Sequence, residues 1–156
     1  MNSSVLSASR KNILVVDDEA AFLESLSEGL RLYDEEFEVF TAENGRKALE
    51  EFRRGRRIDL LVTDLRMPEM DGFELLSNIR RDFPGTRAIL MTAFVTEEIE
   101  KRLKAIGNYA CIEKPVGFDE LRRRIRGELD FSPILEDGSA PGIGEEIFDF
   151  KSKLFN

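Results

Sequence analysis

The chain has 156 residues, of which 42% are apolar and 35% are charged, and its formal net charge is −8. These values are typical of one globular domain with a real core, and the acidic balance argues against nucleic-acid binding by the domain as a whole. The sequence contains no histidine, which excludes every Ser/His or Cys/His mechanism and every His-ligated metal site within these residues.

Five short apolar runs predict the strands of a sheet. In chain order they cover residues 13–16, 37–42, 58–62, 88–91 and 109–112. Four of them are almost continuously apolar, as expected of strands covered on both faces in a parallel sheet. The second run, FEVFTA, alternates between apolar and polar residues and is predicted to lie towards an edge.

An amphipathic helix is predicted after each strand, because apolar residues there recur every three or four positions. Five strand–helix repeats favour a right-handed, doubly wound α/β fold with a five-stranded parallel sheet, (βα)5. The arginine-rich run at 122–126 is predicted to be the solvated face of the last helix. The expected inward-facing residues are Leu23, Leu26, Leu30 and Tyr33; Ala48, Leu49 and Phe52; Leu75, Leu76 and Ile79; Ile99, Leu103 and Ile106; and Phe118, Leu121, Ile125 and Leu129.

The composition changes after residue 130. The stretch FSPILEDGSAPGIG is rich in turn formers, and residues 131–156 are too short for another ordinary domain. Farther on, Ile147, Phe150 and Leu154 stand at helical spacing. We therefore expect an N-terminal extension over 1–10, one domain over 11–130, and a C-terminal tail over 131–156. The tail is expected to dock on this domain or a partner, or to begin an output region.

Five chemically distinctive side chains follow or end the predicted strands, at the edge of the sheet where doubly wound folds bind ligands. Asp17 and Asp18 follow the first strand, Asp64 the third, Thr92 the fourth and Lys114 the fifth. Carboxylates brought together tend to raise one another's pKa, and a hard cation such as Mg²⁺ relieves their repulsion. Acids, one lysine and one hydroxyl suit a phosphoryl group, whose charge the metal and the ammonium would share.

Four motifs appear in a fixed order: ILVVDDE, LLVTDLRMPEMDG, ILMTA and EKP. In this order and spacing they resemble the receiver domain of two-component response regulators, over roughly residues 11–130. The resemblance implies a flavodoxin-like receiver fold and a phosphoryl-accepting signalling switch that uses Mg²⁺.

The resemblance also implies a role for each residue of the site. Asp64 is the phosphate acceptor, and Asp18 and Asp64 hold Mg²⁺ through their carboxylates. Asp17 contributes through water, and Arg66 through its backbone carbonyl. Thr92 hydrogen-bonds the phosphoryl oxygens.

Lys114 pairs with the same oxygens, and the peptide bond between Lys114 and Pro115 is expected to be cis. One position departs from the family pattern: receivers usually carry Tyr or Phe three residues before the lysine, where this chain has Cys111. Cys111 is expected to be a small buried residue, and the usual aromatic link to the output surface is in question. Tyr109 and Phe94 are the candidate substitutes.

The implied partners lie outside this sequence. A phosphohistidine donor has to come from another protein, a sensor histidine kinase or a histidine phosphotransfer protein. The output is expected to be a downstream protein or a missing output domain of the same protein, and a second copy of the chain is a further candidate partner. The face of the fourth and fifth helices is expected to mediate contacts. Direct nucleic-acid binding and membrane contact are not expected. The lone cysteine and the absence of a signal or membrane-spanning run predict a cytoplasmic location.

Two other functions remain open from the residues. One is a receiver-like interaction module that works without phosphorylation, which the small residue Cys111 favours. The other is a small magnesium-dependent phosphatase with Asp64 as nucleophile, for which the chain lacks an obvious cap segment. The expected protein is not an enzyme with turnover: it accepts a phosphoryl group from a donor and loses it slowly.

Overall fold

The computed structural model describes residues 10–33 and 35–137 of the chain. Five strands form one parallel sheet in the order β2-β1-β3-β4-β5. The two outer strands are β2 and β5, and β2 is the alternating run that was predicted at an edge. The strands are β1 Lys11–Val16, β2 Phe37–Ala42, β3 Leu60–Asp64, β4 Arg87–Thr92 and β5 Ala110–Glu113.

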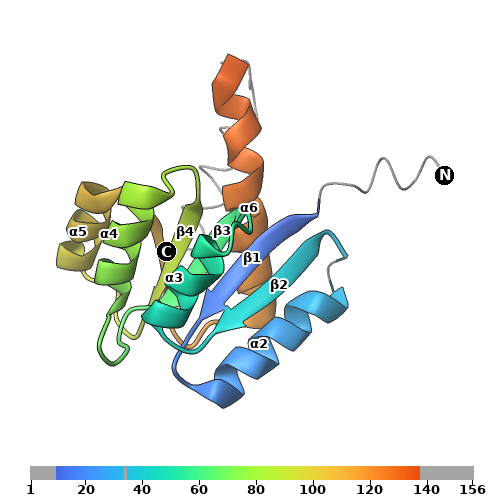
Figure 1. Ribbon diagram of the computed structural model, residues 1–156, viewed down its shortest axis with the longest axis horizontal. Helices are drawn as coiled ribbons and strands as arrows, with labels where there is room; N and C mark the ends of the chain where they lie inside the picture. Colours follow the sequence, from blue (N-terminus) through green and yellow to red (C-terminus); the bar gives the residue numbers. More distant parts are fainter. Residues whose placement is uncertain (1–9, 34, 138–156) are drawn as a thin grey trace.

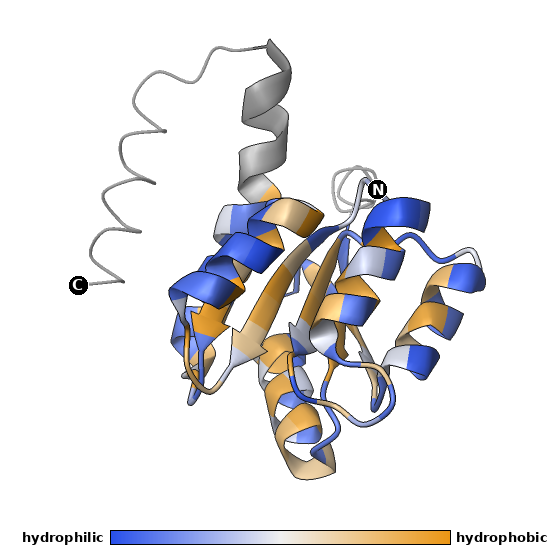
Figure 2. Ribbon diagram, turned by 90° about the vertical axis from the view of Figure 1, so that its left-hand side faces the viewer, coloured by the Kyte–Doolittle hydropathy of each residue, from blue (hydrophilic) through white to orange (hydrophobic). Residues whose placement is uncertain are grey.

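Helices cover both faces of the sheet, which confirms the doubly wound fold (Figure 1). Apolar residues of α3, α4 and α5 pack on one face, and those of α2 and α6 pack on the other. Figure 2 shows mainly hydrophobic residues along the strands and hydrophilic residues on the outer faces of the helices around them. The helices are α2 Ala20–Tyr33, α3 Gly45–Arg53, α4 Gly72–Asp82, α5 Glu97–Ile106 and α6 Phe118–Asp137.

Side-chain caps set where three of the helices begin. The side chains of Asn44, Asp71 and Thr96 accept hydrogen bonds from backbone N–H groups in the first turns of α3, α4 and α5. Each bond satisfies one of the donors that a helix start leaves without an intrahelical acceptor. The helices of this face therefore start at defined points just past the strand ends.

Gly72 fixes the start of α4 directly against the end of β3. Its N–H donates to the carbonyl oxygen of Leu65 at 2.8 Å. A Cβ atom at position 72 would lie 2.6 Å from Leu90 Cδ1 and 2.7 Å from the backbone oxygen of Asp64. The glycine of the MPEMDG motif therefore allows the close approach that keeps the loop after Asp64 compact.

The last helix, α6, contains a buried arginine that the sequence prediction placed in solvent. Arg124 lies in the run predicted to be solvated, yet it is only 6% exposed, so the prediction is wrong for this residue. The reason is helical spacing: Arg124 follows Leu121 by three positions and precedes Ile125 by one, and both of those residues are fully buried. Its neighbour Arg123 is exposed, as predicted.

The helix α6 continues past residue 130 and ends at Asp137, beyond the edge of the sheet at which the strands begin (Figure 1). The proposed helical pattern of Ile147, Phe150 and Leu154 lies outside the described residues. Within residues 10–33 and 35–137, no helix combines the length and the apolarity that a membrane crossing requires.

Candidate functional site

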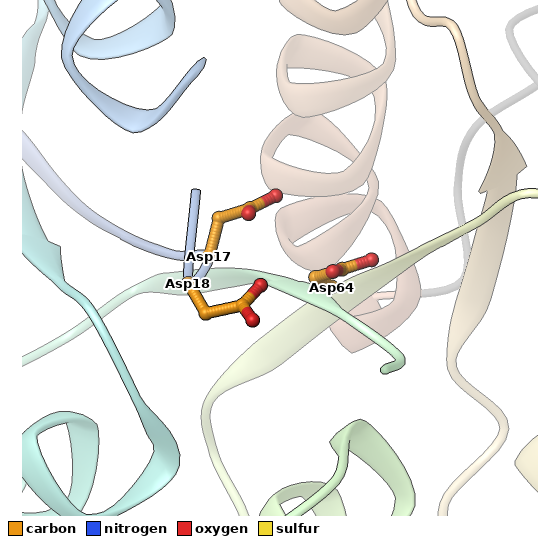
Figure 3. Close-up of side chains that lie close together, drawn as sticks. All are labelled: Asp17, Asp18 and Asp64. Carbon is orange, nitrogen blue, oxygen red and sulfur yellow. The ribbon is translucent and has the colours of Figure 1, made fainter. Parts of the chain in front are cut away.

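Three aspartates meet where the sheet reverses its strand order. β1 and β3 are neighbours in the middle of the sheet, and their connecting helices leave to opposite faces, which opens a crevice beyond the carboxyl ends of the strands. Asp17 and Asp18 follow β1, and Asp64 is the last residue of β3. One oxygen atom from each of these side chains lies within 4.8 Å of the others (Figure 3).

Asp17 is the deepest member of this acidic cluster. It is fully buried, and its Oδ1 accepts a hydrogen bond of 2.8 Å from the backbone N–H of Glu19. Its Oδ2 accepts one of 3.0 Å from Lys114 Nζ. A buried carboxylate needs such partners to remain charged, and both partners come from segments adjoining the acidic cluster.

Lys114 connects the two buried aspartates. Its Nζ lies 3.0 Å from Asp17 Oδ2 and 3.3 Å from Asp64 Oδ1, and 4.7 Å from the centre of the Phe22 ring. Its backbone N–H donates to the Thr92 carbonyl at 2.7 Å, which ties the lysine to the end of β4. The peptide bond between Lys114 and Pro115 is cis, as expected.

Burial and charge act in opposite directions on the two partners of this ion pair. Burial raises the pKa of Asp64, and the attraction of Lys114 only partly offsets it, while the nearby charge of Asp17 raises it further. Burial lowers the pKa of Lys114, but its hydrogen bond and attraction to Asp17, and then to Asp64, outweigh burial and raise it. The site therefore holds a firmly protonated lysine against a carboxylate that is costly to ionise.

Thr92 and Arg66 flank the cluster without joining the ion pair. Thr92 ends β4 beside β3 and is 4% exposed; its hydroxyl lies 3.5 Å from the Phe94 carbonyl oxygen, a long distance for this bond. Arg66 is exposed and follows Asp64 by two residues, in the loop before α4. The fold thus brings together four of the expected side chains and places Thr92 at the next strand end.

The donor set fits a magnesium ion. Oxygen atoms of three carboxylates converge, and they range from the buried Asp17 to the exposed Asp18. Mg²⁺ prefers a few carboxylate oxygens and keeps several of its waters, so a cluster open to solvent on one side suits it. Asp18 is the exposed member of the cluster and gives that open side; Figure 3 shows its side chain close to those of Asp17 and Asp64.

The sequence did not indicate all residues of the site. Phe22 lies in the first turn of α2. Its position shortly after the DDE motif was the only sequence feature that could have indicated its contact with Lys114. Glu113 accepts a 2.9 Å hydrogen bond from the N–H of Val95, so the end of β5 holds the loop that follows Thr92. Nothing in the sequence pattern indicated that contact, because it joins the last residue of β5 to the loop after β4, 18 residues earlier in the chain.

The candidate readout residues have different surroundings. Cys111 is 6% exposed, as expected, and burial raises the pKa of its thiol. Phe94 is 75% exposed. Tyr109 is half-buried, and its hydroxyl oxygen is buried without a hydrogen-bond partner among the described residues. The exposed Phe94 ring and the half-buried Tyr109 ring therefore remain candidates for the readout on different grounds: one is open to a partner, and the other holds a hydroxyl left unpaired by the described residues.

Comparison with known proteins agrees with this geometry. The family model of the response regulator receiver domain matches residues 13–126. A response regulator receiver protein of Anaeromyxobacter sp. (strain Fw109-5) is 42% identical over 106 residues, which cover 68% of this chain and 43% of that protein. The transcriptional regulatory protein GlrR of Escherichia coli (strain K12) is 36% identical over 126 residues, covering 81% of this chain and 28% of GlrR. This chain thus spans less than half of either relative.

Solved structures give the same result for the fold. The CheY-like response regulator receiver domain protein from Methanospirillum hungatei JF-1 has a TM-score of 0.72 and 31% identity, over 78% of this chain and 95% of that one. The receiver domain protein from Clostridium thermocellum has a TM-score of 0.72 and 26% identity, over 80% and 98%. By its sequence, its sheet order and its cluster of strand-end aspartates, the chain belongs to the response regulator receiver domain family of two-component systems.

Proposed function

We propose that this receiver domain is a phosphorylation switch in which Asp64 accepts a phosphoryl group from a phosphohistidine of another protein. The observation that carries the proposal is the bridge from Lys114 Nζ to Asp64 Oδ1 and Asp17 Oδ2, at 3.3 and 3.0 Å. A protonated amine beside a carboxylate at an open strand end is suited to stabilise a phosphoryl oxygen there. These residues contain no histidine, so the phosphohistidine lies outside them, and we propose a sensor histidine kinase or a histidine phosphotransfer protein as the donor.

In the proposed step, one Oδ atom of Asp64 attacks phosphorus in line with the bond to the donor nitrogen. An oxygen–phosphorus bond forms, the nitrogen–phosphorus bond breaks, and the imidazole leaves with the donor protein. Lys114 keeps its proton throughout and moves from carboxylate to phosphoryl oxygen as its main contact. The reaction relies on positioning and charge stabilisation rather than on acid–base chemistry by this chain.

A magnesium ion fits this role as the cofactor. Asp18 and Asp64 would hold it through their carboxylates, Asp17 through water, and Arg66 through its backbone carbonyl. When bound, the ion supplies positive charge that offsets both the acidic cluster and the incoming phosphoryl oxygens. The raised pKa of Asp64 is that of the carboxyl group beside Asp17 and Lys114 without the charge of this ion.

Phosphorylation is proposed to change the surface next to Thr92. The Thr92 hydroxyl has only a 3.5 Å contact to the Phe94 carbonyl, so it can turn to a phosphoryl oxygen at small cost. The loop that carries the exposed Phe94 would move together with Thr92, and this movement would change the surface that the loop forms next to α5 and β5. We place the protein in the cytoplasm, with a downstream protein or a further domain of the same protein as its target.

The proposal is tested by incubating the purified chain with acetyl phosphate and Mg²⁺ and measuring its intact mass. We expect addition of one phosphoryl group in the wild type, none in Asp64→Asn, and a normal level in Asp82→Asn, which removes an aspartate at the far end of α4. EDTA should abolish the addition in every variant. Equal modification of wild type and Asp64→Asn would reject Asp64 as the acceptor, and no modification of either would favour a phosphate-independent interaction module.

A further inference from the structure

Arg124 is a buried arginine that contacts the strand leading to Lys114. It lies on α6, is 6% exposed, and donates a hydrogen bond of 3.1 Å from Nη2 to the backbone carbonyl oxygen of Cys111. Arginine is almost never buried to this extent unless its guanidinium is satisfied. This contact therefore joins α6 to β5 at a point three residues before Lys114.

The outer side of β5 has no further strand to hold it. In the described part of the chain, β5 pairs with β4 alone and is last in the sheet order. Alternate backbone groups of such an edge strand point away from the ladder and need other partners. Arg124 donates to the carbonyl of Cys111 from a charged guanidinium, and such a hydrogen bond is stronger than one from a neutral donor.

A surface pocket of about 140 Å³ adjoins this contact, between α5, β5 and α6. Its lining includes the exposed Glu100 and Lys104 as well as Leu103, Cys111 and Arg124, so it opens to solvent. A side chain larger than that of Cys111 would fill part of it. The hydrogen bond of Arg124 spans from α6 to β5 beside this unfilled space.

We propose that Arg124 is a positioning residue for phosphoryl transfer: by holding the Cys111 carbonyl it sets the end of β5 and so the direction of Lys114 Nζ. The inference rests on the proposed function of Asp64. Lys114 has to keep its amine near both Asp17 and Asp64, 3.0 and 3.3 Å away. A displacement of about 1 Å at such a group can lower a rate by about a hundredfold.

The test compares three variants at a temperature at which all are folded, as verified by circular dichroism. Arg124→Met removes the donor and keeps most of the apolar stem, Arg124→Lys keeps the charge with a shorter reach, and Arg123→Met changes the exposed neighbour as a control. The readouts are the initial rate of Asp64 phosphorylation by acetyl phosphate with Mg²⁺, and the hydrogen exchange of the Lys114 amide, which donates to Thr92.

We expect Arg124→Met to phosphorylate roughly tenfold more slowly and to exchange the Lys114 amide faster, with Arg124→Lys intermediate and Arg123→Met like the wild type. A lower melting temperature with an unchanged rate and unchanged exchange would show a merely structural role and overturn the inference. If Arg124→Met does not fold, Arg124→Lys decides by the same criteria. If the wild type itself accepts no phosphate, the proposed function fails, whereas exchange at Lys114 still tests the hold of Arg124 on β5.

Discussion

Replacing Lys114 by Met tests the charge balance of the site. The substitution keeps a long side chain but removes the ammonium that lies 3.0 Å from Asp17 Oδ2 and 3.3 Å from Asp64 Oδ1. Asp17 is fully buried, so its carboxylate loses the cation that compensates it. Removing one partner of a buried ion pair costs about 3–5 kcal/mol.

The expected loss is smaller here, because the Lys114 side chain is 21% exposed and water screens part of the attraction. We expect a decrease of about 2 kcal/mol in the free energy of unfolding. In a domain of this size, about 2 kcal/mol corresponds to a decrease of roughly 6–10 °C in melting temperature.

The assay is thermal unfolding by circular dichroism at neutral pH in EDTA. Lys104→Met, which removes an exposed lysine of α5, is the control and should melt like the wild type. The double variant Asp17→Asn with Lys114→Met should recover much of the loss, since no buried charge remains at position 17. Added Mg²⁺ should raise the melting temperature of Lys114→Met more than that of the wild type. Equal melting temperatures of Lys114→Met and wild type in EDTA would refute this reasoning.

Three further substitutions test other parts of the account. In EDTA, Asp64→Asn should raise the melting temperature, because burial raises the pKa of this carboxyl. Wild-type stability declines as pH rises from the ordinary carboxyl value to the raised pKa of the folded state. The gain should therefore vanish in acid, below the ordinary carboxyl range, and a gain that persists there would contradict this. Gly72→Ala should lose about 1–3 kcal/mol in denaturant titration, because its Cβ meets the Asp64 backbone at 2.7 Å, and a neutral effect would show that the loop has room. Phe94→Ala should change stability by less than about 0.5 kcal/mol, since the ring is 75% exposed; a larger loss in the same titration would mean that the ring is packed.

The sequence was sufficient for the sheet because burial on both faces leaves a simple pattern. The interior strands β1, β3 and β4 are nearly continuous apolar runs, and the edge strand β2 alternates, so both their identity and their order in the chain could be predicted. The strand ends were less certain. β3, for example, begins at Leu60 rather than at the first residue of the apolar run, Ile58, whereas it ends at Asp64 as predicted.

The site could be predicted as a set of residues but not as a set of contacts. The position of Asp17, Asp64 and Lys114 at strand ends follows from the parallel sheet. That Lys114 bridges the two aspartates depends on the path of the chain after β5, which no local pattern encodes. Arg124 was assigned to the wrong side of α6 because a run of arginines suggests solvent, although its spacing from Leu121 puts it on the buried stripe.

A crystal structure of the chain with Mg²⁺ and beryllofluoride, a phosphoryl mimic, tests the central claim most directly. The account predicts beryllofluoride on an Oδ atom of Asp64, a metal ion held between Asp18 and Asp64, and Lys114 Nζ in contact with a fluorine atom. Beryllofluoride bound elsewhere, or a Lys114 side chain turned away from Asp64 with no cation beside Asp18, would contradict it.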